Sequence, residues 1–159
     1  MGAAADRARR YAREAAPHAR RDPWMEPLLS PAQLRSWSGF AIVVVGAGIL
    51  LATLSPIRGA EDGCPLGLPC LAWHFGLFAA FGVAIAARYA TSEAARRSPQ
   101  RVLGMVALGI WVFAAATEIG QGWVDGRDPE LLDWLANMAG AVFGLLLGST
   151  ALRWLLSGR

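Results

Sequence analysis

The amino-acid sequence predicts an all-α membrane protein, a bundle of four transmembrane helices with both termini in the cytoplasm. Of the 159 residues, 55% are hydrophobic and only 17% are charged. The long apolar segments are apolar all round, whereas a helix of a soluble domain keeps one polar face for water. The arginines gather beside these segments on one side, as they do in the cytoplasmic loops of membrane proteins.

Four segments are long enough to cross about 30 Å of hydrocarbon at about 1.5 Å per residue. We place them at residues 37–57, 71–90, 102–121 and 131–156. The second segment could also be a buried helix of a soluble bundle, but Phe75 to Ala87 offers no polar face to water. Residues 37–159 are therefore predicted to form one transmembrane domain.

Residues 1–36 are predicted to be an Arg-rich cytoplasmic segment before the first span. No apolar core precedes residue 37, so the segment does not resemble a secretory signal peptide and is expected to stay on the mature protein. Its Ala and Arg content predicts either a short helix up to Pro17 on the inner leaflet or a solvated tail. We assign no functional role to His18 in this segment.

The arginines also set the predicted orientation, because basic residues near span ends stay in the cytoplasm. Seven of the fifteen basic residues precede the first span, four lie between spans two and three, and two lie at the C-terminus. Only Arg58 and Arg127 fall on the other side. Loops 56–70 and 122–130 are therefore expected to face outward from the cell membrane. The net charge of +3 comes from these arginines, which flank the apolar spans and do not form a separate basic domain. We therefore predict no nucleic-acid partner.

Cys64 and Cys70 are the only cysteines, and both lie in the predicted outward loop. Disulfides persist outside the cytoplasm, and two prolines and a glycine between the cysteines let the chain bend back. One interpretation is a disulfide, and the other is a metal site that adds His74, although a fourth ligand is not evident. We predict no bound metal and no other cofactor.

Polar side chains within the spans gather at one depth. His74 lies about three residues, or roughly 5 Å, below the outer boundary of span two. Span three runs outward and ends with Glu118 and Gln121, and span four begins with Asp133 and Asn137. Residues three or four apart share a helix face. Ionisable groups at this depth are costly in lipid, so we expect these five side chains to point into the bundle.

Glycines continue the Asn137 face along span four. Gly140, Gly144 and Gly148 follow Asn137 at helical spacing. Small residues at this spacing let a neighbouring helix approach closely. The pattern predicts close packing, either inside the bundle or at a dimer interface.

Arg127 lies in the second outward loop, between two aspartates. Asp125 with Gly126, and Asp128 with the proline after it, favour a tight turn that leads into the next helix. We expect this turn to hold Arg127 over the helix ends, within reach of Glu118 or Asp133. Its planar guanidinium suits a carboxylate or a phosphate equally well.

The order and spacing of these residues resemble the VanZ-like family. The resemblance is carried by a His-Phe pair, a Glu-x-x-Gln pattern, a Gly-Arg pair and a series of Asp, Asn and Gly, namely His74, Phe75, Phe78, Glu118, Gln121, Gly126, Arg127, Asp133, Asn137, Gly140 and Gly144. It extends from about Leu71 to Gly148. Ala72 and Trp73 stand where the family usually has an Asp or Lys.

The resemblance implies a small integral membrane protein of about four helices at the cell envelope. The namesake of the family is associated with low-level resistance to the glycopeptide teicoplanin. Membership implies an envelope role and an effect on glycopeptide susceptibility, but it names no reaction.

One hypothesis is a ligand site for an anionic envelope lipid, such as a polyprenyl-phosphate-linked wall precursor. Arg127 and His74 would contact the phosphate, and Gln121 and Asn137 would bind polar groups of a sugar or peptide. Membrane lipids in general are the other expected partners.

Two further hypotheses use the same residues. An enzyme at this site would use Glu118 or Asp133 as general base and His74 as general acid. A non-catalytic scaffold would instead use the polar residues as an interhelical network that fixes the register of the helices.

Overall fold

The computed structural model describes residues 30–55 and 68–157, and the regular secondary structure in these ranges is helical. The helices are α2 (Pro31–Leu54), α3 (Cys70–Ala90), α4 (Glu93–Arg97), α5 (Pro99–Gln121) and α6 (Leu131–Ser157). The predicted helix up to Pro17, as well as Cys64, lies outside the described residues.

Four of these helices are long and apolar enough to cross a membrane. The spanning stretches are Ala32–Leu54, Cys70–Ala90, Pro99–Gln121 and Leu131–Trp154. Large apolar side chains such as Val43, Leu103 and Leu146 are exposed on the outside of the bundle, where they are favourable in lipid and costly in water. The prediction of an all-α bundle with four transmembrane helices is confirmed. Its orientation stays a prediction from the arginines.

The first span differs most from the predicted boundaries. α2 begins at Pro31 instead of residue 37, because Ser30 caps the helix. The Ser30 hydroxyl accepts a hydrogen bond from the backbone nitrogen of Gln33 at 3.2 Å, and the Ser30 backbone nitrogen donates to Gln33 Oε1 at 2.8 Å. This capping box starts the helix within the segment predicted to precede it. α2 ends at Leu54, before the predicted end at residue 57.

The link between α3 and α5 contains α4, a short helix that the hydropathy pattern does not reveal. The Ser92 hydroxyl accepts a hydrogen bond from the backbone nitrogen of Ala95 at 3.4 Å and thereby caps α4. Arg97 pairs with Glu93 one turn away at 3.6 Å. The chain therefore reverses direction over a very short distance before α5 begins.

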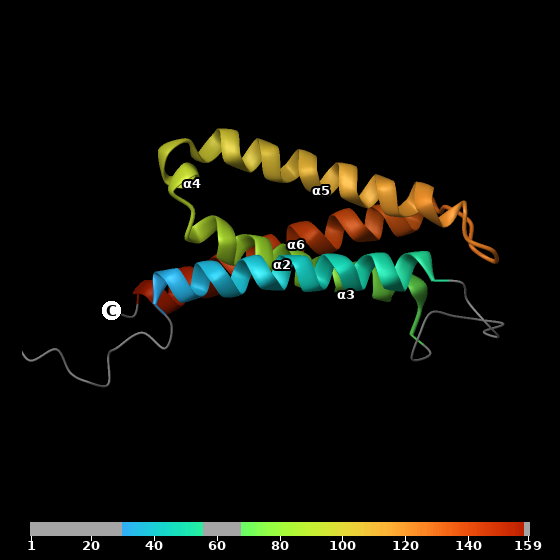
Figure 1. The fold of residues 1–159 in the computed structure, drawn as a ribbon, viewed down its shortest axis with the longest axis horizontal. Helices are drawn as coiled ribbons and strands as arrows, with labels where there is room; N and C mark the ends of the chain where they lie inside the picture. The colour runs from blue at the N-terminus through green and yellow to red at the C-terminus, as the bar shows by residue number, and fades with distance from the viewer. Residues whose placement is uncertain (1–29, 56–67, 158–159) are drawn as a thin grey trace, which may run out of the picture.

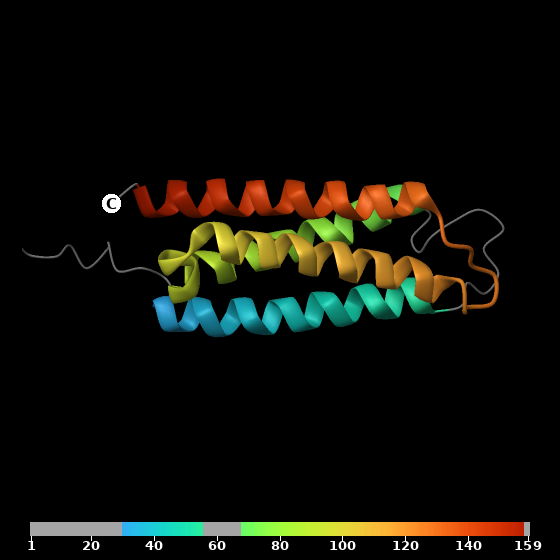
Figure 2. The same cartoon turned by 90° about the horizontal axis from the view of Figure 1, so that it is seen from above.

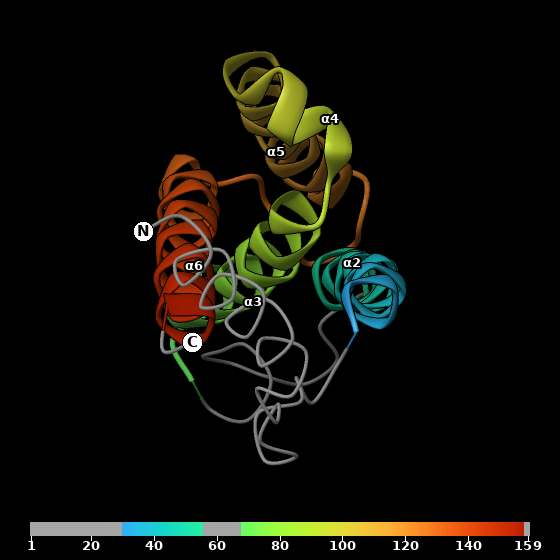
Figure 3. The same ribbon diagram turned by 90° about the vertical axis from the view of Figure 1, so that its left-hand side faces the viewer.

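α3 occupies the middle of the bundle. It packs most extensively against α6 on one side and also against α2 on the other, with α5 lying across it (Figure 2, Figure 3). α5 comes close to α6 at its Gln121 end and diverges from it towards α4 (Figure 1). The start of α2, the short α4 and the end of α6 lie at the same end of the bundle (Figure 1, Figure 2). We call this the α4 end of the bundle, and the opposite one the loop end, after the loop between α5 and α6.

Glycines bring the backbones of α3 and α6 into direct contact. A Cβ atom at Gly140 would collide with the carbonyl oxygen of Phe75, and one at Gly148 would lie 2.8 Å from the Cβ atom of Ala86. Gly82 of α3 meets the backbone of α6 in the same way. Larger residues at these positions would hold the two helices apart. The glycines of the fourth span thus face the interior of the bundle.

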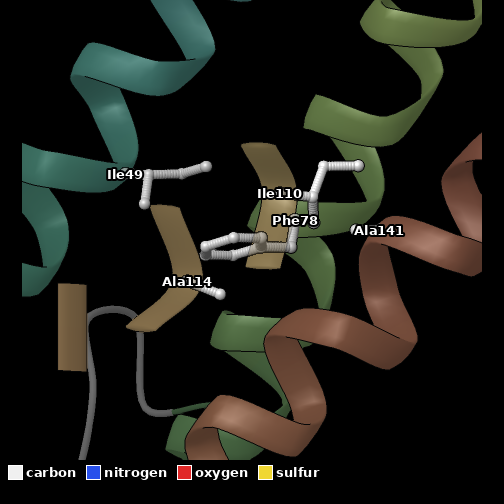
Figure 4. Packing of buried hydrophobic residues seen from close by; sticks show 5 residues of the cluster. All are labelled: Ile49, Phe78, Ile110, Ala114 and Ala141. Carbon is white, nitrogen blue, oxygen red and sulfur yellow. The ribbon is translucent and has the colours of Figure 1, made fainter. Parts of the chain in front are cut away.

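The apolar core lies where all four long helices meet (Figure 4). It is built from the buried residues Ile49 of α2, Phe78 of α3, Ile110 and Ala114 of α5, and Ala141 of α6. Between α3 and α5 the contact is made by aromatic rings, because the rings of Phe78 and Phe113 lie 5.8 Å apart. Small residues therefore join α3 to α6, and large ones join α3 to α5.

Replacement of Gly144 by Ala is expected to lower the free energy of unfolding by about 1–3 kcal/mol, because a buried methyl group with no room strains its surroundings. The new methyl group would collide with the backbone carbonyl of Ala79. Gly76→Ala on α3 is the matched control, since nothing lies within 4 Å of its Cβ position. Reversible unfolding of the purified protein in detergent measures the difference, and equal stability of the two variants would contradict the close contact.

Candidate functional site

Five polar side chains meet at the loop end of the bundle, and we call them the polar cluster. They are His74 of α3, Glu118 and Gln121 of α5, and Asp133 and Asn137 of α6. Four of them are buried, with exposed fractions of 3% for His74, 6% for Glu118, 2% for Gln121 and 0% for Asn137. The structure therefore brings four of the five predicted side chains into contact, and it buries the fifth, Gln121, about one turn beyond Glu118 on α5.

A chain of hydrogen bonds runs across three helices through Asn137. Its side-chain nitrogen donates to Glu118 Oε1 at 2.8 Å, and its Oδ1 lies 3.0 Å from His74 Nδ1. The amide nitrogen of Asn137 therefore faces Glu118, and its amide oxygen faces His74. As a result, α3, α5 and α6 are joined by one buried side chain.

The position of Asn137 depends on the glycine one turn further along α6. Gly140 lies against the backbone of Phe75, next to His74 in the sequence. This close approach lets the short Asn137 side chain span the distance between the two helices. The packing of α3 and α6 therefore also sets the geometry of the polar cluster.

The second ring nitrogen of His74 faces a carboxylate. Nε2 lies 3.3 Å from Asp133 Oδ2, and the Asp133 side chain is 14% exposed. Neutral imidazole carries one N–H and donates to either Asn137 or Asp133, whereas imidazolium donates to both. His74 therefore lies between two acceptors, with the Glu118 carboxylate 3.6 Å from Nδ1.

Two buried atoms of the polar cluster have no hydrogen-bond partner within the described part of the chain. One is the acceptor Glu118 Oε2 and the other is the donor Gln121 Nε2. A buried polar atom without a partner costs about 1–3 kcal/mol. One acceptor and one donor of the cluster are thus left without a hydrogen-bond partner by geometry, although the backbone nitrogen of Glu130 also acts on the Glu118 carboxylate.

Arg127 lies at the same end but binds a different helix from the one expected. Its Nε donates to the backbone oxygen of Ser55 at 3.1 Å, and its Nη2 donates to that of Ala52 at 2.9 Å. Gly126 before it has a φ of 80°, which glycine adopts without strain and which shapes the turn. The guanidinium caps the carboxyl end of α2 and forms no ion pair with Glu118 or Asp133 among the described contacts.

The charge of Arg127 still acts on the polar cluster. Partial burial lowers the pKa of its guanidinium, and the carboxylates of Asp133 and Glu118 act in the opposite direction. The group stays a cation, because the ordinary arginine pKa lies far above neutrality. The loop end therefore combines two carboxylates, one histidine and one guanidinium.

The carboxyl end of α2 is the part of this arrangement that sequence reasoning missed. The last carbonyls of a helix lack partners within the helix, and α2 has no basic residue in its last turn to bind them. Ser55 binds the carbonyl of Leu51, and the carbonyls of Ala52 and Ser55 are left for a donor from another part of the chain. Arg127, the single arginine in the loop between α5 and α6, supplies this donor.

Residues 30–55 and 68–157 contain no group of three His, Cys, Asp or Glu side chains arranged to hold a metal ion. Cys70 begins α3. Its predicted disulfide with Cys64 stays a prediction, and the alternative metal site stays untested, because Cys64 lies outside the described residues.

No protein-family model, curated protein or solved structure matches the chain. The resemblance to the VanZ-like family therefore stays a prediction based on the residues quoted above.

Loss of the Arg127 guanidinium is expected to loosen the last turn of α2. In Arg127→Ala, the amides near Ala52 and Ser55 should exchange hydrogen at least about tenfold faster, because two charge-assisted hydrogen bonds are lost and a tenfold change corresponds to only about 1.4 kcal/mol. Hydrogen–deuterium exchange read by mass spectrometry measures this change. Arg97→Ala is the control, since Arg97 pairs only with exposed Glu93 in the described structure. The same α2 exchange rate in both variants would show that Arg127 does not cap α2.

Proposed function

We propose that the chain is a VanZ-like multi-pass protein of the cell membrane whose polar cluster binds the polar part of an envelope lipid at the outer leaflet. The observation that carries this proposal is the pair of buried atoms without partners, Glu118 Oε2 and Gln121 Nε2. A ligand hydroxyl can donate to a carboxylate and accept from an amide. Sugars carry such groups at high density, and sugar-linked lipids are abundant precursors of the cell wall.

The charge at the loop end favours an anionic lipid. Arg127 uses two of its five N–H donors on α2 and keeps its positive charge. Guanidinium groups bind phosphate well, because their planar fork matches two phosphate oxygens. A polyprenyl-phosphate-linked precursor would offer both a phosphate for Arg127 and hydroxyls for the polar cluster.

An acid–base reaction at this site would use His74. Its ring lies between the Asp133 carboxylate and the Asn137 amide, the position that a general acid of such a reaction would need. Glu118 is the candidate base, because one of its oxygens has no partner in the described structure. Binding is the conclusion that the geometry supports best, and catalysis would be an addition to it.

A second candidate function is the scaffold, which the Asn137 contacts favour. Asn137 joins three helices and is fully buried. Interhelical hydrogen bonds in membranes contribute about 0.6 kcal/mol on average, so several of them together can fix helix register. A purely structural network does not explain the unpaired donor and the unpaired acceptor, because each buried polar atom without a partner destabilises the fold.

Gln121→Leu separates the two functions. Gln121 Nε2 has no partner in the described structure, so its removal is expected to leave thermal stability unchanged or slightly raised. The purified parent protein in detergent should gain about 2–3 kcal/mol of stability from a polyprenyl-pyrophosphate-linked sugar at about 100 times its Kd. The ligand site predicts that Gln121→Leu loses most of this gain, and that Glu118→Gln also loses it, because the amide replaces the unpaired acceptor oxygen by a donor nitrogen.

Thr117→Val is the matched control, since Thr117 is buried beside Glu118 and its hydroxyl bonds only within α5. It should keep the full gain from the ligand. A parent protein with no gain, or a Gln121→Leu variant with the full gain, would leave the scaffold as the function. Expression of the same variants tests the envelope role. The parent protein should change teicoplanin susceptibility, Gln121→Leu should lose this effect, and Thr117→Val should keep it.

A further inference from the structure

A second feature lies at the α4 end, far from the polar cluster. It is a cavity of ≈ 430 Å³ between α2, α3 and α5, lined by Ile42, Ile85 and Val106 among others, with the rings of Phe81 and Phe113 beside them. Sites for small organic ligands typically have about 300–1,000 Å³. The cavity is thus large enough for part of an extended apolar chain.

The divergence of α5 explains why the cavity exists. α5 stays close to α6 at the loop end and moves away towards α4 (Figure 1). The rings of Phe81 and Phe113 lie 5.3 Å apart and separate α3 from α5 at this level. Nothing within 4 Å would meet a Cβ atom at Gly109, which also lines the cavity. The cavity is therefore an open groove with room for a side chain.

One end of the groove is polar. Arg88, Tyr89 and Ser92 lie there, where α3 passes into α4. The Tyr89 hydroxyl donates to the backbone oxygen of Pro99 at 3.2 Å, which joins the end of α3 to the start of α5. No carboxylate in residues 30–55 or 68–157 forms an ion pair with Arg88. A positive charge thus lies at the end of an apolar groove.

We infer that this groove binds an anionic phospholipid of the leaflet at the α4 end, with one acyl chain between α2, α3 and α5 and its phosphate at Arg88. The groove lies between membrane-spanning helices, where acyl chains rather than water are the available filling. The charge of Arg88 complements a phosphate, and Arg96, Arg97 and Arg101 add positive charge at the same end. Arginines at the α4 end also predict that this leaflet is the cytoplasmic one, which is the anionic leaflet.

Native mass spectrometry of the full chain in detergent tests the inference with three probes: phosphatidylglycerol, phosphatidylcholine with the same acyl chains, and glycerol phosphate as the headgroup alone. The parent protein should bind phosphatidylglycerol about fivefold more tightly than phosphatidylcholine, the effect of about one arginine. Arg88→Gln should remove most of this preference, whereas the control Arg101→Gln should keep most of it, because Arg101 does not line the groove. Glycerol phosphate should not compete with the intact lipid.

Gly109→Phe tests the groove itself, since its ring would occupy the space of the acyl chain. It should weaken binding of both lipids about tenfold, the loss of roughly two buried methylene groups. Gly104→Phe is the control on the same helix, because its Cβ position is also open but does not line the groove. If Gly109→Phe does not fold, Gly109→Leu replaces it.

Three results would each overturn the inference. They are equal binding of the two lipids by the parent protein, equal binding of phosphatidylglycerol by the Gly109 and Gly104 variants, and competition by glycerol phosphate. The last result would identify a phosphate site in place of a lipid groove.

Discussion

The burial of Asn137 between a histidine and a carboxylate is the constraint on which the rest of the structure depends. Its amide has to meet His74 of α3 and Glu118 of α5 at the same time. Polar groups within a bilayer are expensive without partners, so the ends of three helices must lie at one depth. Glycine contacts between α3 and α6 make this possible, because they bring the two backbones within reach of one short side chain.

The same constraint gives the bundle two different ends. At the loop end α5 is held to α6 by a hydrogen bond from Asn137 to Glu118. Towards the α4 end its contact with α3 passes through Phe81 and Phe113 instead, and the helix diverges. A polar cluster therefore forms at one end, and an apolar groove with Arg88 at its mouth forms at the other. In a bilayer the two ends of a spanning bundle lie in opposite leaflets, so the two features lie on opposite sides of the membrane.

Much of this arrangement follows from sequence, and the exceptions have physical reasons. Hydropathy predicts four spans, and helical spacing places His74, Glu118 and Asn137 at one depth. The start of α2 is missed because a capping box, and not the apolar run, fixes it. The contact of Arg127 with the carboxyl end of α2 is missed, because a helix pattern in the sequence does not show which backbone carbonyls at a helix end lack a hydrogen-bond donor. The sequence does not predict the groove either, because the groove depends on the direction in which α5 diverges from the neighbouring helices.

A comparison of unfolding free energies tests the central constraint most directly, with Asn137→Leu, Glu118→Leu and the double variant measured in detergent. Asn137→Leu removes the partner of Glu118 and leaves a buried carboxylate with one contact fewer. If Asn137 and Glu118 are coupled as described, adding Glu118→Leu to Asn137→Leu restores about 1–2 kcal/mol, and the double variant is more stable than the Asn137 single variant. A double variant whose loss equals the sum of the two single losses would contradict the account.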